Sequence, residues 1–148
     1  MSFRTLWIPA AVLVAGCQNP NQRPTPTPET PAERPSAPLS KNEQDLKRVC
    51  EQLLTALESG DVRFQWEHLS NLEKTDSQGK TLTTYESYAD AYVRNRDQII
   101  REAKGAGVRK VTVSGTGGDV LVKLGTGEMK VQTFLWEGGT WKYYRMRQ

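Results

Sequence analysis

Few side chains in this sequence have the types and spacing that catalysis or metal binding needs. The chain holds one histidine, His68, and two cysteines, Cys17 and Cys50, which are too few for the usual zinc sites built from Cys and His. His68 could serve as a general base near neutral pH, but a surface or half-buried ring beside Phe64 is the simpler expectation. Cys50 falls on an apolar helical stripe, where we expect it to pack as a small hydrophobic residue. We therefore expect no catalytic residue, no metal site and no cofactor.

Two glycine-rich segments lack the surroundings of a nucleotide-binding loop. Gly105-Ala106-Gly107 follows a helical pattern and precedes a strand pattern, which reverses the order of a dinucleotide fingerprint, and Gly115-Thr116-Gly117-Gly118 is explained by a hairpin turn. The 20 basic side chains nearly balance the 17 acidic ones, and they form no basic stripe. We therefore expect no nucleic-acid partner.

The residues best suited to a ligand site are aromatic. Trp66, Tyr88, Tyr92 and Trp136 belong to a dense aromatic set, and aromatic walls with few polar groups are typical of small-molecule pockets, although core packing is the commoner role for any single one. Arg96 stands where the apolar stripe of a long helix should continue. Its side chain either extends along the edge of the core or enters a cavity, where it would prefer an anion or a carboxylate. These five residues form our candidate ligand-binding set.

The N-terminal segment resembles the signal of a bacterial lipoprotein. One basic side chain, Arg4, precedes an apolar run of about ten residues, which is half the length of a membrane-spanning helix. The run ends in Leu13-Val14-Ala15-Gly16-Cys17, which resembles a lipobox. The resemblance implies cleavage before Cys17 and attachment of two or three acyl chains to it. Such chains anchor a protein stably, because each buried methylene contributes about 0.8 kcal/mol.

Residues 1–16 are thus predicted to be a signal peptide, and residues 17–40 a lipidated, disordered tether. Seven of the eight prolines lie between residues 18 and 40, and hardly any aliphatic side chain does, so we expect a spacer with polyproline-II bias. Gln18 rather than Asp follows the cysteine, which by resemblance to Gram-negative lipoproteins favours the outer membrane. We expect a cell-envelope protein that is anchored to a membrane and faces the periplasm or the exterior.

Residues 41–148 are expected to form one domain of the α+β class. Apolar residues recur at intervals of three and four in three segments, which predicts helices at 42–59, 62–72 and 83–104. Gly60 suits the end of the first helix, and Thr83-Thr84-Tyr85-Glu86 has the spacing of a capping box. The period then changes to two, which predicts hairpin-linked strands at 108–114, 119–124, 129–136 and 140–146. We expect three helices packed on the concave face of a curved antiparallel sheet of about four strands.

Two short motifs resemble those of the NTF2-like (cystatin-like cone) superfamily. They are Leu57-Glu58-Ser59-Gly60-Asp61-Val62 between the first two helices and Trp136-Glu137-Gly138-Gly139-Thr140-Trp141-Lys142 near the end. The resemblance covers about residues 42–146. It implies a cone that encloses a pocket between the long helix and the sheet, which some members use for isomerase or hydratase chemistry and others to bind a ligand or a partner.

We expect a non-catalytic module that binds a small apolar or amphipathic ligand, or an envelope protein, at the mouth of the cone. The alternative is a small enzyme of the isomerase or hydratase kind, with His68 or a pocket carboxylate as base and a tyrosine as oxyanion donor. A third hypothesis is a purely interacting protein that uses an exposed apolar patch on the outer face of the sheet. The family also makes a homodimer through the sheet an expectation.

Overall fold

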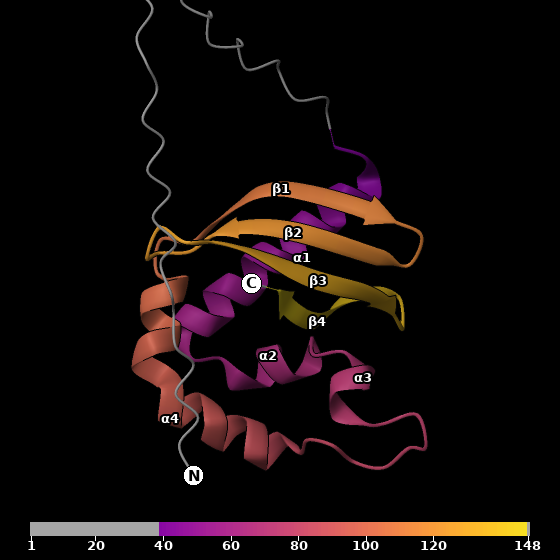
Figure 1. The fold of residues 1–148 in the computed structure, drawn as a ribbon, viewed down its shortest axis with the longest axis vertical. Coiled ribbons are helices and arrows are strands. Elements are labelled where there is room, and N and C mark those ends of the chain that lie inside the picture. The colour runs from indigo at the N-terminus through magenta and orange to yellow at the C-terminus, as the bar shows by residue number, and fades with distance from the viewer. Residues whose placement is uncertain (1–38, 148) are drawn as a thin grey trace, which may run out of the picture. The chain divides into compact units, whose positions relative to one another are not determined.

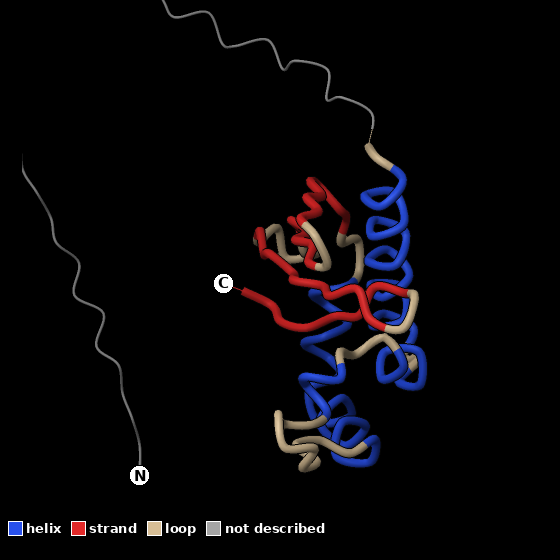
Figure 2. The backbone as a smooth tube through the Cα atoms, turned by 90° about the vertical axis from the view of Figure 1, so that its right-hand side faces the viewer, coloured by secondary structure: helices blue, strands red, loops and turns tan. Residues whose placement is uncertain are grey.

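The domain has two layers, a four-stranded antiparallel sheet and helices packed against one of its faces (Figures 1 and 2). The computed structural model describes residues 39–147. This confirms the predicted α+β class and the antiparallel sheet of four strands. The predicted signal peptide, the predicted lipidation site Cys17 and nearly all of the predicted tether lie outside the described residues.

Helix α1 (Lys41–Ser59) supplies the helical half of the core. Ser40 and Glu43 form a capping box at its start, as each side chain bonds the other residue's backbone N–H. Its buried stripe packs against valines and Phe134 of the sheet and consists of Leu46, Val49, Cys50, Leu53, Leu54 and Ala56. The helix ends at Gly60, whose φ of 79° is the left-handed conformation that glycine adopts without strain.

The segment predicted as one helix at 62–72 forms two short helices, so the described residues contain four helices rather than three. These are α2 (Val62–Glu67) and α3 (Asn71–Lys74). Between them the backbone turns to pair with the last strand: Tyr143 N donates to His68 O at 2.6 Å, and Ser70 N donates to Tyr143 O at 2.7 Å. Hydrogen bonds to a strand edge replace the helical ones here, which breaks the helix.

Ser70 also fixes the start of α3. Its hydroxyl accepts from Leu72 N at 3.2 Å and donates to Glu137 Oε1 at 2.6 Å. Asn71 N donates to the other oxygen of the same carboxylate at 3.0 Å. Glu137 thereby ties the beginning of α3 to the hairpin between the last two strands.

Helix α4 (Tyr85–Ala103) matches the predicted 83–104 segment to within two residues. Its cap is Thr84 rather than Thr83, because the Thr84 hydroxyl accepts from Ser87 N at 3.2 Å, and Ser87 takes the role expected of Glu86. The helix makes its main contacts with α1 and α2 and runs beside the sheet (Figure 1).

The four strands follow one another as a meander, in the order β1-β2-β3-β4. They are β1 (Gly107–Ser114), β2 (Gly117–Lys123), β3 (Met129–Glu137) and β4 (Thr140–Arg147), each within two residues of its prediction. Val120 and Val122 on β2 face α1, so Leu121 between them lies on the outer face of the sheet. The register of β1 shifts between Val108 and Lys110, which marks a β-bulge at this edge strand.

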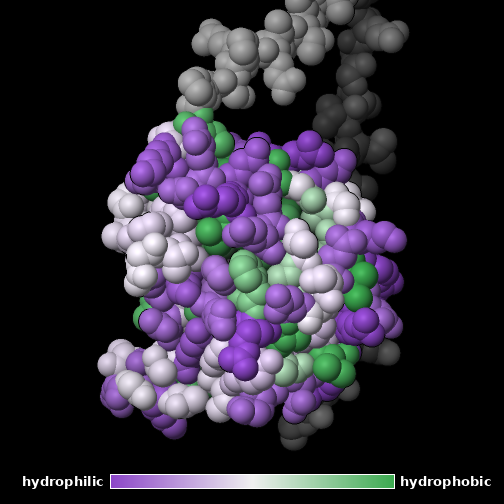
Figure 3. Space-filling model, turned by 180° about the vertical axis from the view of Figure 1, so that it is seen from behind, coloured by the Kyte–Doolittle hydropathy of each residue, from purple (hydrophilic) through white to green (hydrophobic). Residues whose placement is uncertain are grey.

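The surface on the helix side is mostly hydrophilic, with only scattered hydrophobic side chains (Figure 3). The exposed large hydrophobic residues of the described chain come from α3, the loop before α4, α4 and the two ends of β3: Leu72, Leu82, Val93, Met129 and Trp136. None of the described helices is both long enough and apolar enough to cross a membrane.

Candidate functional site

A cavity of about 200 Å³, partly open to solvent, lies between α1, α4 and the last two strands. Six of its ten lining residues are aliphatic: Leu53, Leu54, Leu57, Ile99, Ala103 and Leu124. The other four carry polar groups: Tyr88, Glu102, Gln132 and Tyr143. An apolar wall with a few polar groups is typical of small-molecule sites, and this one is smaller than the usual range of about 300–1,000 Å³.

Helical spacing brings the aliphatic residues to one wall. Leu53 and Leu57 are four positions apart on α1, and so are Ile99 and Ala103 on α4, which places each pair on one face of its helix. Tyr92 holds the two helices together, because its hydroxyl donates to Leu57 O at 2.9 Å. Nine of the ten lining residues lie on helices or strands, and Leu124 lies just after the end of β2.

Gln132 on β3 is the most deeply buried polar group of the cavity, at 1% exposure. Its Oε1 accepts from Cys50 Sγ at 3.4 Å, which is a weak bond because a thiol is a weak donor. Among the described residues, the buried side-chain polar atom without a hydrogen-bond partner is Trp141 Nε1, which belongs to the core and not to the cavity wall. Gln132 thus contributes a buried amide to the cavity wall.

Tyr88 and Glu102 each use a glutamine as partner. The Tyr88 hydroxyl donates to Gln65 Oε1 at 3.2 Å, and Gln98 Nε2 donates to Glu102 Oε1 at 2.9 Å. Burial, with a smaller contribution from Tyr92, raises the pKa of Tyr88 to about 12, so the phenol remains protonated at physiological pH. Neither contact is the carboxylate–tyrosine pair that the enzyme hypothesis needs.

The simpler expectation is confirmed for Cys50, which packs in the core, and for His68, whose ring is half-buried beside Phe64. Cys50 is fully buried in the core, and burial raises the pKa of its thiol to about 12, so it is not a nucleophile at neutral pH. The His68 ring is half-buried and stacks on Phe64 with centroids 3.9 Å apart, and its Nδ1 lies 3.0 Å from Phe64 O. His68 is not part of the cavity wall.

Comparison with known proteins was made against family models, curated proteins and solved structures. None of them matches this chain. The lipoprotein signal and the NTF2-like cone therefore stay predictions from sequence motifs, and the site is interpreted from its own chemistry.

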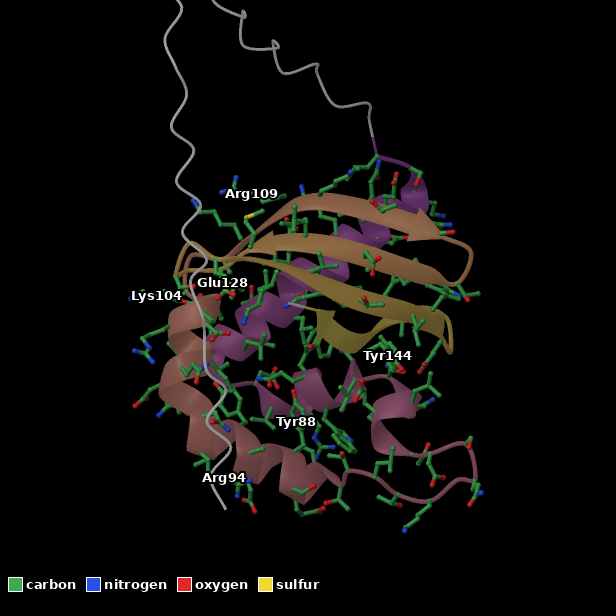
Figure 4. The ribbon with its side chains drawn as sticks, in the orientation of Figure 1. Tyr88, Arg94, Lys104, Arg109, Glu128 and Tyr144 are labelled. Carbon is green, nitrogen blue, oxygen red and sulfur yellow. The ribbon has the colours of Figure 1, made fainter. Side chains whose placement is uncertain are left out.

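Three of the five candidate ligand-binding residues lie near one another beside the cavity. Tyr88 lines it, and its side chain points inward from α4 (Figure 4). Trp66 packs on the Tyr88 ring with centroids 5.8 Å apart and does not reach the lining. Tyr92 is buried at the junction of α4 and α1. Trp66 and Tyr92 thus support the wall that Tyr88 belongs to.

The other two candidates are elsewhere. Arg96 is exposed on α4, in a shallow hollow formed by residues of its own helix. Of the two alternatives for its side chain, entry into the cavity is therefore wrong. Trp136 is 44% exposed at the end of β3, where its ring meets Trp141 edge-on with centroids 5.3 Å apart. The structure does not bring either residue to the cavity.

Sequence reasoning missed Gln132 and Glu102. For Gln132 a signal existed. It lies two positions before Phe134 on β3, so both side chains face the core, and a polar residue at a core position is a candidate for a functional role. Glu102 comes three positions after Ile99 on the same helical face, but an acidic residue near a helix end is common on surfaces, so the sequence carries no comparable signal for it.

Proposed function

We propose that this protein is a membrane-anchored lipoprotein of the cell envelope whose folded domain binds a small apolar or amphipathic ligand without transforming it. The ligand site is the cavity between α1, α4 and the sheet, and the anchor is Cys17. The domain is proposed to be an NTF2-like cone. The observation that carries the binding function is a mostly aliphatic cavity of about 200 Å³ whose wall holds a few polar groups, the most deeply buried of which is the Gln132 amide.

The size of the cavity limits the ligand. A cavity of about 150 Å³ with Leu, Ile and Phe walls stays dry and binds benzene, so about 200 Å³ suits a group of six to eight carbons. Burying six methylenes is worth about 5 kcal/mol at about 0.8 kcal/mol each. After the cost of association this leaves an affinity of about millimolar or weaker.

The contacts around the cavity support binding rather than catalysis. Within the described chain the two best general bases are poorly placed, because His68 is outside the cavity wall and the Glu102 carboxylate is engaged by Gln98. The hydroxyl of Tyr88, which lines the cavity, donates to the amide oxygen of Gln65, and the hydroxyl of Tyr92 donates to Leu57 O. No described contact favours the isomerase or hydratase alternative.

A pair of tryptophan substitutions on α4 tests the binding function. Ile99→Trp adds bulk to the cavity wall, whereas Val93→Trp adds it at a position that is 68% exposed on the same helix. Each substitution is made in the full chain carrying Cys17→Ala, and binding of 1-hexanol at millimolar concentration is followed by NMR. We expect 1-hexanol to shift the signals of cavity residues with the native cavity wall and with Val93→Trp, and not with Ile99→Trp. Equal shifts in all three proteins would show that the ligand is not in this cavity.

The anchor is tested separately. In wild-type protein from membranes we expect an N-terminal Cys17 that carries two or three acyl chains, and in Cys17→Ala we expect no acylation and loss of the protein from the membrane fraction. Intact-mass analysis and membrane fractionation measure both. An unmodified chain with a different N-terminus would refute the anchor and leave the cavity proposal standing.

A further inference from the structure

The outer face of the sheet is left uncovered by the described part of the chain, because the helices pack against the other face (Figure 2). The valines on either side of Leu121 face α1, so Leu121 and Lys123 lie on the outer face of β2. The register of β3 places Val131 opposite Leu121 and Met129 opposite Lys123. These four residues therefore share the outer face.

Three of the four form a small apolar surface. Met129 is 46% exposed, and Leu121 and Val131 are half-buried. Side chains directly opposite each other on neighbouring strands are in contact range, and successive outward residues of one strand lie about 7 Å apart. Leu121, Met129 and Val131 are thus neighbours rather than scattered exposed residues.

Basic side chains border this apolar surface. Lys123 lies beside Met129, and Lys110 of β1 lies opposite Leu121. Arg109 precedes Lys110, and all three cations are exposed. None of them forms an ion pair with a carboxylate of the described residues, so each is available to a partner.

The β-bulge in β1 adds one of these cations to the outer face. Val108 packs against the core and Val111 is buried in it, and in a regular strand one of the two residues between them would point inward. The register shifts between Val108 and Lys110 instead. Arg109 and Lys110 therefore both point away from the core, and two adjacent positive charges lie on the same side.

The positive surface continues onto the C-terminus of α4. Gly125 N donates to Glu102 O at 2.7 Å, which holds the turn after β2 against the last turn of α4. Arg101 and Lys104 are exposed there, and Figure 4 shows Lys104 and Arg109 at the same end of the domain. This end of the domain is therefore rich in cations from α4, β1 and β2.

The carboxylates of this region do not cancel that charge. Glu128 lies 3.9 Å from Lys130 in an ion pair. Asp119, further along the outer face of β2, accepts from Thr133 Oγ1 at 2.7 Å. The exposed cations at this end have no such partners, so the excess charge of the surface is positive.

An apolar centre with a cationic border matches an anionic lipid bilayer. Lys and Arg side chains bind the phosphates of the head groups, and a flexible apolar side chain such as Met129 suits the boundary with the acyl chains. A nucleic acid would use the cations but not the apolar centre. A second copy joined through the same face would bring the cations of both copies together.

We infer that the outer face of the sheet docks on an anionic lipid bilayer, with Met129 towards the acyl chains and Arg109, Lys110 and Lys123 against the phosphates. This goes beyond the proposed function, because it concerns a surface other than the cavity and holds whether or not Cys17 is acylated. Docking in this orientation turns the helices away from the membrane.

An environment-sensitive fluorophore at residue 129 tests the inference. Met129→Cys in the full chain carrying Cys17→Ala is labelled with NBD, and Gln52→Cys, at an exposed position of α1, is the matched control. Cys50 is fully buried, so the added cysteine takes the label. The fluorophore reports its own surroundings, so attachment of the vesicle through residues 1–16 does not by itself produce a signal.

The vesicles contain phosphatidylcholine alone or mixed with phosphatidylglycerol. With the mixed vesicles we expect the emission at residue 129 to shift to the blue, and with phosphatidylcholine alone we expect no shift. High salt should reverse the shift, because it screens exposed charges. The label at residue 52 should remain in water throughout.

Two pairs of substitutions locate the charges. Lys110→Gln with Lys123→Gln should raise the lipid concentration needed for half of the shift about 25-fold, at about fivefold for each cation. Lys80→Gln with Arg94→Gln removes the same charge from exposed positions on α4 and the loop before it, and should change that concentration less than about twofold.

Several results would overturn the inference. If the label at residue 129 stays in water with the mixed vesicles, the face does not dock. An equal shift with phosphatidylcholine alone would mean that charge does not select the partner, and equal effects of the two pairs would mean that overall charge acts instead of this face. A shift without vesicles that grows with protein concentration would show that a second copy covers the face. None of these results bears on ligand binding in the cavity.

Discussion

The two fully buried glutamines of this domain should lose different amounts of stability on the same substitution. Gln65 and Gln132 are each 1% exposed. Gln65 uses both ends of its amide, donating to Ala56 O at 2.9 Å and accepting from Tyr88 at 3.2 Å. The amide oxygen of Gln132 accepts a weak bond from Cys50 Sγ at 3.4 Å. Methionine has a similar length and no strong hydrogen-bonding group, so Gln→Met at either site removes the amide and keeps most of the packing.

The magnitudes follow from what each substitution leaves behind. Gln65→Met loses two hydrogen bonds, worth about 1 kcal/mol each, and leaves the Tyr88 hydroxyl without its acceptor. Ala56 O keeps hydrogen-bond donors after the substitution, because Gly60 N and Asp61 N also donate to it. We expect a loss of about 2–3 kcal/mol. Gln132→Met gives up the bond from Cys50 Sγ, which is weak, so we expect a change of less than about 1 kcal/mol.

Urea unfolding of the ligand-free full chain measures both values, as one domain of this size should unfold in one cooperative step. The midpoint should move to lower urea for Gln65→Met and change little for Gln132→Met, with unchanged slopes. Equal destabilisation by both substitutions would refute the reasoning, because it would mean that the two hydrogen bonds of Gln65 contribute no more than the thiol bond of Gln132.

The remaining predictions concern packing, a buried thiol and a helix cap. Gly118→Ala should cost about 1–3 kcal/mol in the free energy of unfolding, because its new methyl would lie 2.4 Å from Leu46 Cδ2, whereas Gly117→Ala, with nothing nearer than 3.7 Å, should be close to neutral by thermal melting. Cys50 should resist alkylation at pH 8 until the chain is unfolded, as mass spectrometry can show; modification of the folded chain would contradict its burial. The pKa of this thiol is about 12 in the folded chain, so the unfolded chain loses the proton at lower pH. The stability gained by burying the protonated thiol is therefore complete below about pH 9 and is lost as the pH rises towards 12. Urea titrations at increasing pH should follow this loss. Ser70→Ala should cost about 1–2 kcal/mol, measured by urea unfolding, because the hydroxyl caps α3 and donates to a carboxylate of β3 at 2.6 Å.

The features that the sequence predicted well are those with local causes. Gly60 follows the last residue of α1 because a left-handed residue is needed there, as its place after the apolar stripe predicted. The strand bounds were predicted within two residues because glycine-bearing turns separate runs that alternate between buried and exposed. The burial of Cys50 followed from its place on the apolar stripe of one helix.

The features that escaped prediction depend on partners far along the chain. The break between α2 and α3 exists because His68 and Ser70 bond the backbone of Tyr143, and no periodicity near residue 68 records that strand. The role of Gln132 has a similar origin. The alternation of β3 indicates that the Gln132 side chain faces inward. Whether it lies in the packed core or lines a cavity depends on how α1 and α4 pack against the sheet.

The bulge in β1 has a consequence for how copies of this protein can meet. An edge strand offers unpaired backbone groups that a second chain can extend, and regular, uncharged edges are the usual starting points of aggregation. Here the register breaks beside Lys110, and Arg109 projects outward at the break (Figure 4). Two such edges placed side by side would bring like charges together over a distorted ladder. At the opposite edge, the segment around Leu69 already occupies part of β4. Self-association by strand addition is therefore disfavoured at both edges, and a homodimer of this domain would have to join through faces.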